Sequence, residues 1–215
     1  KKLSYYCWFL SVLAIASCSP QKEEAINGAI VESEKLKFAV DTITTELKNP
    51  WGIAFLPDGR ALVTERAGEI RIIKDGKLLD EKIQGVPPVY AHGQGGLMDI
   101  QLHPDFAKNG WIYLSYSKQV ADSGGTVIAR AKIEGNTLTN LEELFQALPL
   151  SKSEVHFGSR ITFDGKGYMF FTSGERGKRE NAQDLTNHLG KVLRLHDDGK
   201  IPVDNPFVST LGAKS

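Results

Sequence analysis

The sequence predicts an all-β fold in which similar antiparallel units repeat along the chain, as the blades of a β-propeller do. Short β-branched and aromatic runs alternate with Asp-Gly, Asn-Gly and Gly-Lys-Gly turns, a pattern typical of antiparallel strands. Three copies of one strand-turn-strand pattern begin at residues 55, 102 and 163. They are 47 and 61 residues apart, near the ~40–50-residue period of propeller blades once longer loops are allowed for. About three blades are therefore expected.

Each copy consists of an apolar strand, a tight turn and a second strand, and the copies run over 55–65, 102–116 and 163–172. The third strand of the unit repeats as well, over 68–76, 128–135 and 190–199. The one segment with a helical pattern is Leu141–Leu148. Because a propeller usually needs roughly four to eight blades to close its ring, three blades indicate a truncated chain, whose last residues from Pro206 onward end in a loop.

The first residues have the layout of a bacterial export signal. Lys1 and Lys2 precede an apolar run over 5–16, which is shorter than the roughly 20 residues of a membrane-spanning helix. The run ends in Ile15-Ala16-Ser17-Cys18, which resembles the lipobox of lipoproteins, so Cys18 is the predicted lipidation site. An ordinary signal peptide with an incidental cysteine, or an uncleaved anchor, stays open.

The expected organisation is a signal peptide over 1–17, a flexible polar tether over 18–34 and a partial propeller domain over 35–215. The protein is expected in the periplasm or cell envelope, in contact with the membrane through its lipid alone. If Cys7 leaves with the signal and Cys18 is lipidated, the mature chain has no thiol for a disulfide. Packing and ring closure must then supply its stability.

The charge balance argues against nucleic acid as a partner. The chain has 26 Lys and Arg and 26 Asp and Glu residues, so it lacks the basic surface that binding to a phosphate backbone requires. With 41% hydrophobic and 24% charged residues, the composition is that of a globular protein. No phosphate-binding P-loop, Cys/His zinc set or nucleophile elbow is present.

Three polar stretches are candidates for a functional site, because loops that follow the first strands of blades are expected to gather at one mouth of the channel. His156 could act as a general base, since imidazole titrates near neutrality. Gln94, in a Gly-rich loop, could donate to a carbonyl or carboxylate of a ligand. Glu175 could orient a histidine, or its basic neighbours could bind an anionic cofactor. The stretches are 92–97, 155–160 and 174–181.

Each candidate also has a structural interpretation. His156 could pack a blade corner, the glycines around Gln94 could serve the turn alone, and the charged loop at 174–181 could be a solvated face. His103 lies in a turn built by proline and aspartate, which favours a structural hydrogen bond. His188 and His196 are interpreted in the same way.

Several ordered motifs resemble the soluble glucose and aldose sugar dehydrogenases that use pyrroloquinoline quinone (PQQ), the glucose/sorbosone dehydrogenase family. The resemblance spans roughly Ala39 to Phe207 and corresponds to the N-terminal half of the family's domain. The first four motifs are Asn49-Pro-Trp-Gly-Ile-Ala-Phe-Leu-Pro-Asp-Gly59, Gly93-Gln-Gly-Gly-Leu97, Leu102-His-Pro-Asp-Phe106 and His156-Phe-Gly-Ser-Arg160. Further motifs follow over 174–177, 182–185, 189–195 and 201–207.

The resemblance implies a six-bladed propeller that holds PQQ beside Ca²⁺ and oxidises the C1 hydroxyl of an aldose to a lactone, passing electrons to an acceptor. His156 matches the catalytic base, and Glu175 aligns with an acidic residue, commonly aspartate in the glucose enzyme, that supports it. Gln94, Arg160 and His156 itself match positions at the cofactor. Val155 stands where the glucose enzyme has aspartate, which is closer to the aldose sugar dehydrogenase branch.

The resemblance also places the Ca²⁺ ligands and most PQQ-binding Arg and Lys residues in blades beyond this chain's end. No metal ligand is therefore expected within the chain, and the fragment alone is expected to be inactive. Fold does not fix function, so two alternatives stay open. One is a non-catalytic, lipid-anchored binding module, and the other is a Ca²⁺-dependent propeller lactonase or esterase.

Overall fold

The structure, a computed structural model, describes residues 28–214 and comprises two units that divide after Thr42. The first unit contains a hairpin of β1 (Ala29–Glu32) and β2 (Lys37–Val40). This hairpin covers part of the predicted tether and the start of the predicted domain. The predicted signal peptide and Cys18 lie outside the described residues. No helix within 28–214 is long and apolar enough to cross a membrane.

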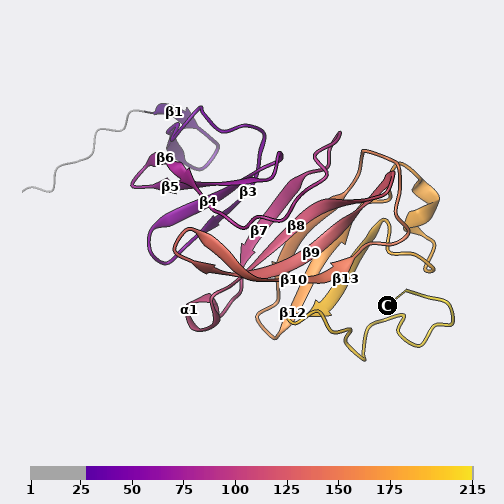
Figure 1. The fold of residues 1–215 in the computed structure, drawn as a ribbon. Helices are drawn as coiled ribbons and strands as arrows, with labels where there is room; N and C mark the ends of the chain where they lie inside the picture. The colour runs from indigo at the N-terminus through magenta and orange to yellow at the C-terminus, as the bar shows by residue number, and fades with distance from the viewer. Residues whose placement is uncertain (1–27, 215) are drawn as a thin grey trace, which may run out of the picture. The chain divides into compact units, whose positions relative to one another are not determined.

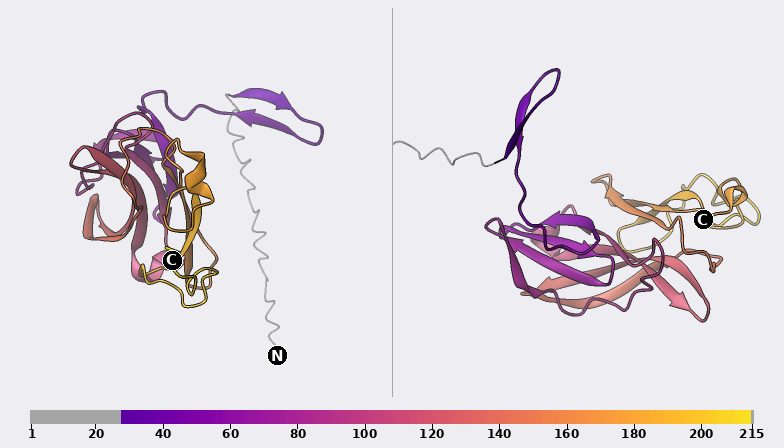
Figure 2. Two further views of the ribbon diagram at one scale, coloured as in Figure 1. Left: turned by 90° about the vertical axis from the view of Figure 1, so that its right-hand side faces the viewer. Right: turned by 90° about the horizontal axis from the view of Figure 1, so that it is seen from above.

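The second unit contains three antiparallel sheets, each with its strands in sequence order. Figure 1 shows the middle sheet between the other two, and Figure 2 shows the same unit from two more sides. The first sheet consists of β3 (Pro50–Phe55), β4 (Arg60–Glu65), β5 (Glu69–Lys74) and β6 (Lys77–Lys82). The second consists of β7 (Leu97–Leu102), β8 (Trp111–Val120), β9 (Ser123–Glu134) and β10 (Thr137–Gln146), with α1 (Phe106–Asn109) after β7. The third consists of β11 (Gly158–Phe163), β12 (Tyr168–Ser173) and β13 (Lys191–His196), with a 3₁₀ turn, η1 (Arg179–Ala182), before β13.

These sheets are the three blades that the sequence repeats predict, and the all-β propeller fold is confirmed. The repeated aspartates close the hairpins locally. Asp58 Oδ1 accepts the N–H of Arg60 at 3.0 Å between β3 and β4. Asp164 Oδ1 accepts the N–H of Lys166 at 2.7 Å between β11 and β12. A short aspartate side chain thus satisfies a turn amide in both blades.

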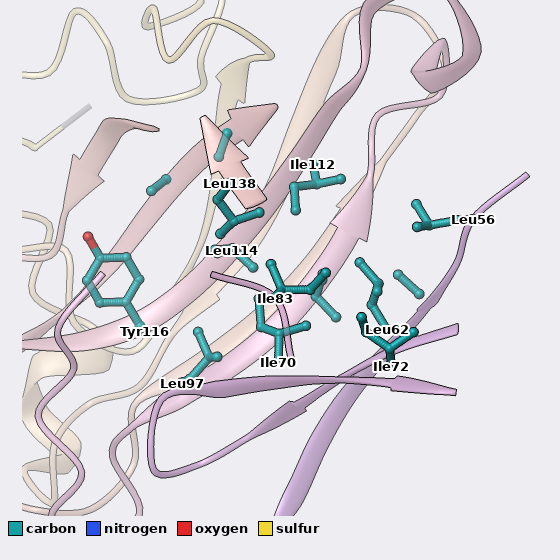
Figure 3. Close-up of a cluster of buried hydrophobic side chains, with 14 of the residues drawn as sticks. Leu56, Leu62, Ile70, Ile72, Ile83, Leu97, Ile112, Leu114, Tyr116 and Leu138 are labelled. Carbon is teal, nitrogen blue, oxygen red and sulfur yellow. The ribbon is translucent and has the colours of Figure 1, made fainter. Parts of the chain in front are cut away.

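The hydrophobic core lies between neighbouring blades. Alternate residues of β8 point to opposite faces of its sheet: Ile112 and Leu114 pack against the first blade, and Tyr113 packs against the third. Figure 3 shows the first of these cores, where Leu62 and Ile70 meet the middle blade. Burial of each such side chain contributes about 1.5–3 kcal/mol. The middle blade is therefore buried on both faces.

The segment Leu141–Leu148 is not helical; most of it belongs to β10. Two register shifts interrupt the pairing of β10 with β9, between Thr139 and Glu142 and between Glu143 and Phe145. Each bulge inserts an extra residue and breaks strict alternation. The apolar residues of a bulged strand then have a spacing that resembles a helical period, which explains why the expected helix was wrong.

Candidate functional site

The first strands of the three blades, β3, β7 and β11, are neighbours in space. Gln94 precedes β7 and His156 precedes β11, and the two residues are in contact. His103 and Phe163 stand at the other ends of the same strands, with ring centroids 5.8 Å apart. The candidate loops therefore meet at one end of the blades, but they precede the first strands or follow the second. The expectation that they follow first strands was wrong.

The loop before β11 holds His156 in a left-handed conformation, with φ of 54°. The N–H of His156 donates to Gln94 Oε1 at 2.8 Å, and the N–H of Gln94 donates to the carbonyl of Glu154 at 2.8 Å. A Cβ at Gly93 would lie 2.5 Å from that same carbonyl oxygen, so this position requires glycine. The side-chain carbonyl of Gln94 thus accepts a hydrogen bond within the protein, while the NH₂ of this exposed residue has no hydrogen-bond partner within 28–214.

The imidazole of His156 is hydrogen-bonded through Nδ1 to Glu175 Oε1. A carboxylate acceptor requires a proton on Nδ1, so the neutral ring keeps the lone pair on Nε2. The His156 side chain is 50% exposed and that of Glu175 is 24% exposed. The hydrogen bond from His156 is the main cause that holds the pKa of Glu175 below its usual range. Glutamate thus reaches the histidine from a position where the glucose enzyme commonly has aspartate.

Arg160 is the third residue of β11. Side chains from β7 and β3, the first strands of the other two blades, hold it in place. Its Nη1 donates to Asp99 Oδ1 at 2.9 Å, and its guanidinium lies 4.2 Å from the ring centroid of Trp51. Asp99 is fully buried and also accepts the N–H of Ile161 at 2.8 Å. The Arg160 side chain remains 58% exposed, so a stacked and anchored guanidinium is presented to solvent.

Sequence reasoning missed Asp99 and did not single out Arg176 in the charged loop after β12. The signal for Asp99 was available, because a lone carboxylate between buried apolar residues requires a partner. The loop after β12 was interpreted as a possible solvated face, and its members differ: Lys178 and Arg179 are exposed, while Arg176 is 3% exposed. No sequence signal distinguishes Arg176 from its basic neighbours.

Two hollows adjoin the third blade. One of about 510 Å³ includes Glu175 and Arg179 among its walls. The other, of about 520 Å³, is mainly apolar and lies between β10, β13 and residues 199–214. It contains none of the predicted site residues.

The predicted structural hydrogen bond is confirmed for His103 and His188, whereas among the described residues His196 makes a ring-packing contact instead of a side-chain hydrogen bond. His103 Nε2 lies 3.0 Å from Asp197 Oδ2, and its Nδ1 accepts the N–H of Asp105 at 2.9 Å. His188 Nδ1 accepts the N–H of Leu148 at 3.0 Å, and burial lowers the pKa of His188. The ring of His196 packs against that of Tyr168.

Residues 47–215 match the family model described as Glucose / Sorbosone dehydrogenase. The chain belongs to this family. It is 44% identical over 181 residues to Aldose sugar dehydrogenase YliI of Escherichia coli K12, covering 82% of this chain and 48% of the relative.

Two solved structures share the fold. The soluble aldose sugar dehydrogenase of Escherichia coli in its apo form is 44% identical, with a TM-score of 0.75 over 78% of this chain and 50% of that chain. The PQQ-bound aldose sugar dehydrogenase of Streptomyces coelicolor is 29% identical, with a TM-score of 0.68 over 87% and 53%. This glucose/sorbosone dehydrogenase chain spans about half the length of the relatives it matches.

Proposed function

We propose that the whole protein oxidises the C1 hydroxyl of aldose sugars to lactones, with PQQ as the hydride acceptor. Family membership supports oxidation of sugars in general. The observation that carries the finer proposal is the His156–Glu175 pair. A carboxylate on Nδ1 leaves Nε2 as a proton acceptor, and the side-chain carbonyl of Gln94 accepts the backbone N–H of His156.

The residues present fit part of a PQQ site. PQQ is an ortho-quinone that carries carboxylates, so it requires cationic groups and N–H donors. Arg160 offers an exposed guanidinium with only Nη1 engaged among the described residues, and Gln94 offers a free NH₂. When bound, PQQ supplies the two-electron acceptor. We also propose a Ca²⁺ ion beside it, held by residues of blades other than the three that the structure describes.

Each residue at this end of the blades has a distinct part in the proposed reaction. His156 Nε2 accepts the proton of the C1 hydroxyl while the hydride leaves the same carbon, so that carbon becomes the lactone carbonyl. Glu175 keeps the proton on Nδ1 and stabilises the imidazolium that forms. Gln94 donates an N–H to an oxygen of the sugar or the cofactor.

The test is reduction of an artificial dye by the whole protein supplied with PQQ, Ca²⁺ and an aldose, with the lactone identified by mass spectrometry. We expect dye reduction that requires both PQQ and sugar. Sugar binding without any turnover would instead support a binding module. Hydrolysis of an added lactone without PQQ would support a lactonase. Either result, in the absence of PQQ-dependent oxidation, would overturn the proposal.

We further propose that the protein is exported and anchored in the cell envelope by lipid on Cys18. The motif that ends in Cys18 and the polar segment after it support this location. Cys18→Ser should release the protein from the membrane fraction or stop its processing. An unchanged mass and membrane fraction after this substitution would argue against lipidation.

A further inference from the structure

Arg176 is a buried cation whose hydrogen bonds all go to backbone carbonyls. Nε donates to the carbonyl of Val155 at 2.9 Å and Nη1 to that of Gly124 at 3.2 Å, and Nη2 donates to the carbonyl of Ser153. Its guanidinium carbon lies 3.6 Å from the ring centroid of Phe157. Among residues 28–214, no carboxylate forms a salt bridge with it.

This arrangement is costly for folding. Removing a charge from water is unfavourable unless hydrogen bonds and an opposite charge compensate, and here only neutral carbonyls and an aromatic face do so. Burial lowers the pKa of Arg176 to about 10, so the side chain is still cationic at neutral pH. A neutral residue would avoid this cost, which indicates that the guanidinium of Arg176, with its several N–H donors, has a specific role.

The partners of Arg176 indicate that task. Ser153, Val155 and Phe157 flank His156 on both sides, and Arg176 directly follows Glu175 in the chain. The two loops also touch through their backbones: a Cβ at Gly174 would overlap the carbonyl oxygen of His156. One guanidinium therefore joins the loop that carries the histidine to the loop that carries its carboxylate.

We propose that Arg176 is the positioning residue of the His156–Glu175 pair. Its planar fork holds the left-handed turn at His156 at a fixed distance from Glu175, and this keeps the Nδ1–H···Oε1 hydrogen bond formed. Lysine cannot replace it, because a single ammonium cannot reach carbonyls in three directions in one plane. Only the expected effect of Arg176 on turnover rests on the proposed function; its expected effect on the His156 tautomer does not.

The first test measures the tautomer of His156 by long-range ¹H–¹⁵N correlation spectra of the whole protein at alkaline pH, where the rings are neutral. The native protein should show His156 with its proton on Nδ1. Arg176→Gln and Arg176→Lys should both show a mixture of the two tautomers. His103 is an internal reference, because its Nδ1 accepts an N–H and its proton must stay on Nε2.

A single Nδ1–H tautomer of His156 in either Arg176 variant would overturn the proposal. The matched control is Arg130→Lys, because Arg130 also stacks on an aromatic ring, at 4.3 Å from Trp111, and also donates to a backbone carbonyl, at 3.2 Å. It should lower the melting temperature without changing the His156 spectrum. If the Arg176 variants do not fold, Phe157→Leu removes the stacking face, and an unchanged spectrum there would equally contradict the proposal.

The second test measures steady-state dye reduction by the same variants. A misplaced base should lower kcat about ten- to a hundredfold with little change in KM, since displacements near 1 Å cost this much in positioned catalysis. If the native protein does not oxidise sugars but the Arg176 variants show the tautomer mixture, only the proposed function is refuted. Normal turnover together with a tautomer mixture would support the positioning role and refute the proposed part of the His156 tautomer in turnover.

Discussion

His103 follows β7 and His156 precedes β11, so the two histidines stand at opposite ends of the neighbouring first strands of two blades. His103 is 11% exposed, and both of its ring nitrogens are engaged, one by Asp197 and one by the N–H of Asp105. His156 is 50% exposed, and among residues 28–214 only its Nδ1 has a hydrogen-bond partner. A ring with both nitrogens occupied cannot accept a proton without breaking a hydrogen bond, whereas the ring of His156 can do so at Nε2.

The difference shows that a carboxylate partner alone does not distinguish a ring that can accept a proton from one that cannot. His103 and His156 each have one. They differ in whether the second ring nitrogen has a partner. They also differ in their surroundings: the rings of Tyr113 and Phe163 pack against His103, whereas the Gly-rich loop with Gln94 leaves His156 exposed. One end of the blades is therefore closed by packing, and the other end is left accessible.

The largest expected effect is the loss of turnover in His156→Gln. Glutamine keeps a similar size but has no basic nitrogen, so kcat of the whole protein should fall by about 10²–10⁴, the usual contribution of a general base. PQQ affinity, measured by titration, should change little. Near-normal turnover would remove the main contrast between the two histidines.

The next effect is on stability, at the aspartate that anchors Arg160. Asp99→Ala leaves the buried N–H of Ile161 and the Nη1 of Arg160 without their acceptor. Each orphaned group costs about 1–3 kcal/mol, and the cost for Arg160 is at the low end because its side chain is 58% exposed to water. We expect a loss of about 2–4 kcal/mol in the free energy of unfolding. Urea unfolding of the whole protein measures this loss. Arg160→Gln is the matched control and should cost less, because Ile161 keeps its partner. Equal losses would show that Asp99 serves only its ion pair.

The fold was predictable because its signals are local. The Asp-Gly and Gly-Lys-Gly turns and the apolar strands beside them repeat in the order of the blades, and the turn aspartates bond to amides two residues away. The failure at Leu141–Leu148 has a local cause too, since its bulges are set by pairing with β9. Such pairing leaves no mark in the sequence of β10 itself.

The site was predictable only in part. The resemblance indicated His156, Glu175, Gln94 and Arg160, but the hydrogen bond from His156 to Gln94 depends on how the second and third blades pack against each other. Asp99 and Arg176 act through partners about 20 to 60 residues away in the chain. Such contacts arise only when distant segments come together in the folded chain, so composition and spacing do not reveal them.

A smaller effect is expected from Glu175→Gln, which keeps the acceptor but removes its charge. Turnover should fall about tenfold or more, because the imidazolium loses its counter-charge. The pKa of Glu175 lies below its ordinary value of 4.5, mainly because of the His156 hydrogen bond. The stabilisation is therefore present above pH 4.5 and is lost as the pH falls through the lower folded pKa. Melting temperatures of native and variant protein should differ at neutral pH and converge in acid, and a constant difference would exclude an ionised Glu175 as the cause.

The smallest effect is expected at the closed end of the blades. His103→Gln removes the hydrogen bond to Asp197 and part of the packing against Tyr113 and Phe163, which should cost about 1–2 kcal/mol and lower the melting temperature by a few degrees. Turnover per folded molecule should not change, because the ring touches nothing near Gln94 or Glu175. Asp197→Asn is the matched control: it should cost a similar amount, and the double variant should lose less than the two costs added together, since both substitutions break the same contact. If kcat of His103→Gln falls while the folded fraction is unchanged, the two ends of β7 and β11 are coupled. The distinction between a structural His103 and a catalytic His156 would then be wrong.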